Sequence, residues 1–120
     1  MKRILCAVTA LTVCMTLLTA CGGPKTALQI GGAQVSSEIY TYYYDLVKRS
    51  PEEYPGDARK NAISLCKEYV AVNTLAAERS ITLKTEQEAA ASAWVNQQWK
   101  FFSTYYTGLG LSKQTLMKVR

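Results

Sequence analysis

The spacing of hydrophobic and polar positions changes three times along the chain. Residues 4–18 are mostly apolar, residues 27–35 alternate over two short runs, and apolar residues then recur at intervals of three and four. A period of two indicates strands, and a period near 3.6 indicates helices. We therefore expect a mainly α-helical domain over residues 27–120, with a short β-hairpin at its N-terminal side.

The hairpin is predicted around Gly31-Gly32, where Leu28 and Ile30 alternate with small or polar neighbours. Two glycines permit a positive φ at both central positions of a two-residue turn. The predicted strands, 27–30 and 33–35, are too short to be stable alone. We expect them to pack against helices.

Four helices are predicted after the hairpin, over residues 37–49, 58–79, 86–106 and 113–120. Hydroxyl or acidic capping residues stand at their starts, and prolines or glycines interrupt the chain between them. These residues are Ser36, Ser37, Asp57, Thr85 and Ser112 at the starts, and Pro51, Pro55, Gly108 and Gly110 between helices. Thr85 and Glu88 have the spacing of a capping box.

The second predicted helix has a wide apolar face, which we expect to be buried against other helices. Its members are Ala58, Ala62, Leu65, Tyr69, Val72 and Ala76, and beside them run Ile63, Cys66, Val70 and Ala77. The last helix has only begun an apolar pattern with Leu116, Met117 and Val119, and isolated helices this short are marginal. Two alternatives follow: this helix docks on the domain, or the chain is a fragment of a longer protein.

The N-terminal segment has the features of an export signal. Met1-Lys2-Arg3 is basic, and the apolar stretch that follows is shorter than the roughly 20 residues that span a bilayer. Leu18-Thr19-Ala20-Cys21 resembles the lipobox of bacterial lipoproteins. That resemblance implies removal of residues 1–20, lipidation of Cys21, and a tether over residues 21–26. The alternative is an uncleaved anchor or a hydrophobic core helix.

Removal of the signal would change the composition of the chain. Of the 120 residues, 100 would remain, and loss of Lys2 and Arg3 would lower the net charge from +5 to +3. That charge is spread along the chain, so we expect no nucleic-acid partner. The sequence has no histidine, which excludes imidazole-based catalysis and His-ligated zinc. We expect no catalytic residue, cofactor or metal.

The number of cysteines also changes if the signal is removed. Four cysteines suggest two disulfides in an exported protein. However, Cys6 and Cys14 would leave with the signal and Cys21 would carry lipid, so Cys66 would remain alone. We expect Cys66 to be a buried small hydrophobe; the alternative is an intermolecular or reactive thiol.

Three stretches together resemble the N-terminal chaperone domain of the SurA and PrsA family of exported foldases, whose helical module is also similar to that of trigger factor. They are residues 28–36, residues 75–88 and residues 108–113. Ser80 stands where family members often have glycine. The resemblance implies a helical domain that holds unfolded exported chains without ATP. It also implies that prolyl isomerisation belongs to a separate, histidine-bearing parvulin domain, so the chain as given is not the isomerase.

Aromatic residues gather in two places, and some of their rings are expected to be exposed because one helix face cannot hold them all. The candidate client-binding residues are Tyr40, Tyr42, Tyr44, Trp94, Trp99, Phe102 and Tyr106. Ideal helical spacing groups Trp99, Phe102 and Tyr106 on one stripe, and Trp94, Phe101 and Tyr105 on another. Tyrosine and tryptophan suit a groove that grips apolar peptide segments. The alternative is that both stripes are core, or are covered by missing C-terminal residues.

These features favour a chaperone or foldase module on the outer face of the cell membrane, with unfolded polypeptides as partners. A second hypothesis is a structural or interaction lipoprotein of the same fold, its aromatic face closed by a partner or a second copy. A third is that the domain continues past Arg120 into a longer peptidyl-prolyl isomerase.

Overall fold

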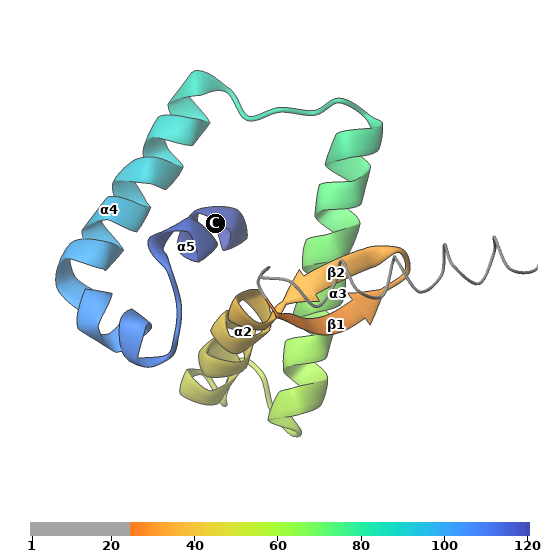
Figure 1. The fold of residues 1–120 in the computed structure, drawn as a ribbon, viewed down its shortest axis with the longest axis vertical. Coiled ribbons are helices and arrows are strands. Elements are labelled where there is room, and N and C mark those ends of the chain that lie inside the picture. Colours follow the sequence, from red (N-terminus) through yellow and green to blue (C-terminus); the bar gives the residue numbers. More distant parts are fainter. Residues whose placement is uncertain (1–24) are drawn as a thin grey trace, which may run out of the picture.

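The computed structural model describes residues 25–120 (Figure 1). Over that range the chain forms strands β1 (Thr26–Ile30) and β2 (Ala33–Ser36), then helices α2 (Ser37–Arg49), α3 (Ala58–Glu78), α4 (Thr85–Gly108) and α5 (Lys113–Val119). The predicted mainly helical fold with a short N-terminal hairpin is confirmed. The predicted signal segment and Cys21 lie outside the described residues.

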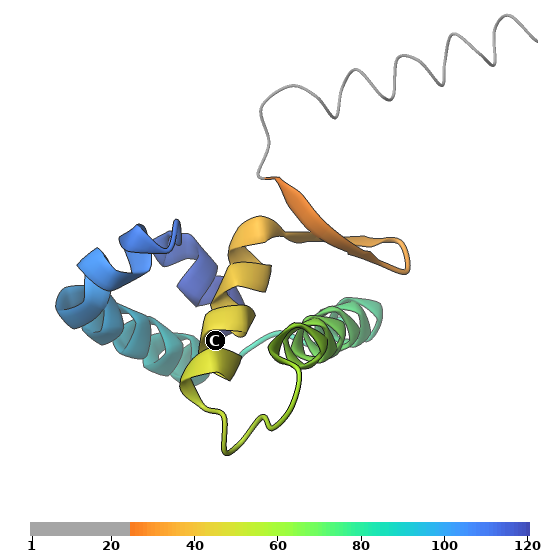
Figure 2. The same ribbon diagram turned by 90° about the horizontal axis from the view of Figure 1, so that it is seen from below.

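The helices are arranged as an open frame. Helices α3 and α4 stand on opposite sides, and the connector between them, residues 79–84, crosses one end of the molecule (Figure 1). Helices α2 and α5 lie between these two sides, and the hairpin extends across α3 (Figures 1 and 2). Helix α2 packs on α3 and the hairpin, whereas α4 packs on α5.

The hairpin has the predicted two-residue turn, with Ile30 paired to Ala33 and Leu28 to Val35. The expectation of positive φ at both glycines was wrong. Gly31 has φ 59°, whereas Gly32 lies outside the left-handed region. A positive φ at the first central residue alone is typical of a type II′ turn, which also matches the twist of the strands. The hairpin therefore requires glycine at position 31.

Three of the predicted helix caps are confirmed. The side chains of Ser36, Asp57 and Ser112 accept hydrogen bonds from the first-turn N–H groups of α2, α3 and α5. The fourth prediction was wrong by one residue, because α4 begins at Thr85 and its N-cap is Lys84. The Lys84 backbone N–H donates to Oε1 of Gln87 at 2.9 Å. Gln87 therefore takes the capping role predicted for Glu88.

Two small clusters form the hydrophobic core. The hairpin core consists of Val35, Ile39 and Cys66, and the α4–α5 core consists of Val95, Tyr106, Leu111 and Leu116. Each cluster receives one side chain from the other part of the molecule: Tyr42 of α2 packs on the α4–α5 core, and Val119 of α5 packs on the hairpin core. Helix α5 thus docks on the domain.

The apolar face predicted for α3 is buried over only half its length. Ala62 and Cys66 are fully buried, and Tyr69 and Val70 are partly buried. Farther along the face, Val72 is 66% exposed, whereas Ala76 is partly buried. Leu75, which lies outside the predicted face, is 45% exposed. The expectation that the whole face is buried was wrong, because the side chain of Val72 lies largely in solvent.

A single carboxylate fixes the start of α5. Glu38, in the first turn of α2, accepts hydrogen bonds at Oε2 from the Ser112 N–H at 3.1 Å and from the Ser112 hydroxyl at 2.8 Å. The Thr115 hydroxyl donates to the same oxygen. These hydrogen bonds, the one from Thr115 foremost, lower the pKa of Glu38.

Candidate functional site

The tyrosines of α2 divide between the two cores. Tyr42 packs on the α4–α5 core, while Tyr43 packs on the hairpin core beside Cys66. Tyr42 and Tyr43 thus belong to different clusters, as a rotation of about 100° per residue favours, although their rings still meet edge to face with centroids 5.4 Å apart. Burial raises the pKa of Tyr43 to about 12. Tyr40 and Tyr44 stack with ring centroids 5.9 Å apart, and both are partly buried.

Three rings of α4, those of Trp94, Trp99 and Tyr106, contribute to the α4–α5 core. Trp99 and Tyr106 stack nearly parallel, with centroids 6.4 Å apart, and Tyr106 is only 6% exposed. Tyr106 is therefore buried in the described structure, and a client-binding role for it stays a prediction. Trp94 packs at the edge of the α4–α5 core, where the Arg120 guanidinium lies 4.7 Å from its ring centroid.

A local break in α4 places Phe102 outside. Residues Val95, Phe102 and Tyr106 share one face of an ideal helix. However, Phe102 has non-helical dihedrals (φ −126°, ψ 16°) at a kink, and its side chain is 50% exposed. Ideal spacing places Trp99, Phe102 and Tyr106 on one stripe, but the kink divides that stripe. Trp99 and Tyr106 stack on each other, whereas the Phe102 side chain points into solvent.

Three neighbouring rings of α4 consequently face solvent. Phe101, Phe102 and Tyr105 are 65%, 50% and 44% exposed, and we call these three residues the aromatic ledge. Phe101 and Phe102 meet edge to face, with centroids 6.5 Å apart. Monomeric domains rarely expose adjacent large apolar side chains unless the surface contacts something else.

Polar groups of α2 hold one end of the aromatic ledge. The Tyr105 hydroxyl donates to Oδ1 of Asp45 at 2.5 Å, and the other oxygen of Asp45 accepts from Nε of Arg49 at 2.8 Å. The Arg49 guanidinium also lies 5.7 Å from the centroid of the Tyr105 ring. The hydrogen bond to Asp45 raises the pKa of Tyr105. Tyr105 is thereby held by α2 while it remains 44% exposed.

The candidates predicted from sequence are thus only partly brought together. Phe102 is exposed, whereas the partly buried members are Tyr40, Tyr42, Tyr44, Trp94 and Trp99. Phe101 and Tyr105, which are exposed beside Phe102, were not among the predicted candidates, although the spacing contained a signal for the exposure of Phe101. It lies about 120° from Val95 around an ideal helix and so points away from the core.

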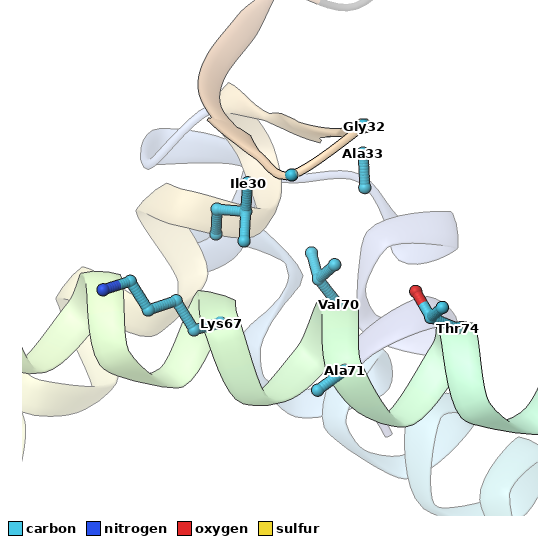
Figure 3. Close-up of a pocket in the computed structure, with 8 residues that line it drawn as sticks. Ile30, Gly32, Ala33, Lys67, Val70, Ala71 and Thr74 are labelled. Carbon is cyan, nitrogen blue, oxygen red and sulfur yellow. The ribbon is translucent and has the colours of Figure 1, made fainter.

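A shallow groove lies between the hairpin turn and α3 (Figure 3). It has a volume of about 510 Å³, and Ile30, Ala33, Val70 and Ala71 form its apolar lining. Lys67 and Thr74 lie along α3 at its border (Figure 3). Lys67 is the one ionisable group among its lining residues.

The described residues offer few other reactive or ligand-binding groups. Cys66 is fully buried, as predicted, and burial raises the pKa of its thiol to about 11. Between Lys25 and Arg120 no three His, Cys, Asp or Glu side chains gather as metal ligands would. Within the same range, none of the helices combines the length and hydropathy needed to cross a bilayer.

The candidate site among the described residues is therefore the aromatic ledge, with Asp45 at one end. Comparison of the chain with protein-family models, curated proteins and solved structures gives no match in any of the three.

Proposed function

We propose that this protein is an extracytoplasmic module that binds unfolded or extended polypeptides without ATP. The observation that carries the proposal is the aromatic ledge, three adjacent rings held at the surface by a kink and by Asp45. Large rings supply much contact area for little loss of side-chain entropy. Stacking and edge contacts tolerate varied apolar side chains, as a binder of unfolded chains requires.

The proposal includes the cellular context inferred from residues 1–26. The chain is exported, its signal is removed after Ala20, and Cys21 carries the lipid that holds it on the outer face of the membrane. The basic start, the apolar segment and the lipobox-like Leu18-Thr19-Ala20-Cys21 support this part. Two or more acyl chains would anchor it stably. Metabolic labelling with a fatty acid tests this, because label that persists after Cys21→Ser would contradict it.

Suppression of aggregation tests the binding activity. Reduced, denatured lysozyme is diluted from denaturant with increasing amounts of the protein, and light scattering is followed. We expect the wild type to suppress scattering, and Phe101→Ser with Phe102→Ser to require a several-fold higher concentration. Val72→Ser with Leu75→Ser is the matched control, because these side chains are as exposed but lie on α3. Equal loss in both variants, or no suppression by the wild type, would contradict the proposal.

The alternative is that the protein is a structural or interaction lipoprotein of the same fold, without chaperone activity. The same ledge would then be covered by one dedicated partner. Binding of a hydrophobic dye by a monomer, lost on Phe101→Ser with Phe102→Ser, favours the polypeptide binder. A stable complex that hides the ledge from dye favours the alternative.

A further inference from the structure

The connector between α3 and α4 joins two separate packing units. The first unit is residues 26–78, with the hairpin core, and the second is residues 85–119, with the α4–α5 core. Every residue of the connector, 79–84, is exposed. Since the connector is exposed along its whole length, the second unit is held to the first by side-chain contacts such as those of Glu38 and Asp45.

The connector begins with a strained residue. Helix α3 ends in a Schellman motif, in which the Ser80 N–H donates to the Ala77 carbonyl at 3.2 Å and the Ile81 N–H to the Ala76 carbonyl at 2.8 Å. Ser80 has φ 52°, the left-handed conformation that side chains disfavour. Helix α4 ends in the same motif, but Gly110 occupies the corresponding position, with φ 77°. The closed connector therefore holds strain that the turn before α5 avoids.

Exposed apolar side chains surround this same point. Leu75 lies just before the connector, Ile81 and Leu83 lie within it, and Val72 lies one turn farther back on α3. Their exposed fractions run from 45% to 66%. The described residues leave all four exposed, and we call these side chains the hinge surface.

We propose that two copies of this chain exchange their α4–α5 units and form a domain-swapped dimer through an opened connector. In the dimer, Glu38 of one copy binds Ser112 of the second, and Asp45 of one copy binds Tyr105 of the second. Every contact between units is kept, and only the connector changes conformation. Strained hinges favour such an exchange, because opening lets the strained residue relax.

The exchange also explains what covers the hinge surface. In the dimer, each opened connector leaves the first unit of its own copy and reaches the first unit of the other copy. Both connectors therefore pass close to the two-fold axis. This brings the apolar residues around one hinge toward their equivalents in the other copy. The hinge surface of one copy is thus covered by the hinge surface of a second copy. The two surfaces match because the two-fold symmetry of the dimer makes them identical, so no separate recognition motif is needed.

Light scattering coupled to size exclusion measures the dimer. The full chain is refolded in mild detergent at low and at high protein concentration. We expect a dimer that increases with concentration and, once formed, dissociates slowly. Ser80→Gly should lower the dimerisation constant about tenfold or more, because glycine removes the strain in both closed copies. Ser64→Gly, the same change at an exposed position inside α3, should lower the constant much less.

A mixing experiment distinguishes exchange from simple association. Two variants, Asp45→Cys and Tyr105→Cys, are made in a chain whose Cys6, Cys14 and Cys21 are serine. They are refolded together and treated with a short bismaleimide. Exchange places α4 of one copy on α2 of the other, so a covalent dimer containing both variants is expected. A wild type that stays monomeric at high concentration, or a dimer that gives no such cross-link, would overturn the proposal.

Discussion

The carboxylate of Glu38 and the hydroxyl of Ser112 lie 2.8 Å apart, although 74 positions separate them in the sequence. Oε2 of Glu38 also accepts from the Ser112 N–H, and the Ser112 oxygen in turn accepts from the Thr115 N–H at 3.3 Å. One acidic side chain thus orients the residue that caps α5. Helix α5 is only seven residues long, so its stability depends on such contacts rather than on its own propensity.

Replacing Glu38 should therefore loosen α5. We expect Glu38→Gln to lower the free energy of unfolding by about 1–2 kcal/mol, because hydrogen bonds to a charged acceptor are replaced by weaker ones. Urea unfolding followed by circular dichroism measures the change. Glu52→Gln, in the exposed loop before α3, is the control and should stay within about 0.5 kcal/mol of the wild type. Equal effects of the two changes would contradict the role of Glu38.

The same carboxylate makes stability depend on pH. Its pKa is lowered in the folded protein from an ordinary value of 4.5, so the folded state favours the ionised form. The stabilisation is therefore complete well above pH 4.5 and is lost as the pH falls through the lowered value. The difference in unfolding free energy between wild type and Glu38→Gln should shrink from about pH 6 to about pH 3. A difference that is constant with pH would show that ionisation of Glu38 is not involved.

Burial should make the Cys66 thiol inert. Its pKa is raised to about 11 and its side chain has no exposed surface, so little nucleophilic thiolate exists at neutral pH. We expect iodoacetamide to leave Cys66 unmodified in the folded protein and to label it fully in urea. Mass spectrometry of the tryptic peptide 61–67 reads out this residue alone. Rapid labelling without urea would instead indicate a reactive thiol.

Two rings of α4 should differ sharply in their effect on stability. Tyr106 is buried against Trp99, so Tyr106→Ala should cost about 3 kcal/mol or more through the cavity that it leaves. Phe101 is largely exposed, so Phe101→Ala should change stability by about 0.5 kcal/mol or less. Thermal unfolding of both variants gives the comparison. A large loss from Phe101→Ala would mean that its ring supports the fold.

The positions of the helices could be predicted because their signals are local. Ser36, Asp57 and Ser112 cap helices where expected, and the burial of Cys66 follows from its place on the apolar face of α3. Periodicity shows that a helix has two faces, but not whether a partner covers each one. Periodicity therefore could not predict that α3 is buried at Cys66 but exposed at Val72.

The exposure of the aromatic ledge could not be read from spacing alone. The sequence groups Phe102 with Tyr106, and an ideal helix would bury both on one face. The structure separates them at a kink, and just beyond it Tyr105 is bound by Asp45, which lies 60 residues earlier. Such a contact between distant segments is invisible to a window of one or two helical turns. The tyrosines of α2 illustrate the opposite case, since Tyr42 and Tyr43 belong to different clusters as simple rotation favours.

The exposed connector also has a consequence for the order in which a newly made chain folds. Chains emerge N-terminus first, so the strands, α2 and α3 can pack while α5 has yet to appear. During that interval the Glu38 carboxylate and the Tyr42 ring have no α5 or α4 to meet. When several chains are made close together, the first α4–α5 unit to arrive can come from a neighbour. Crowding during synthesis, together with protein concentration, would then decide how many copies close on themselves.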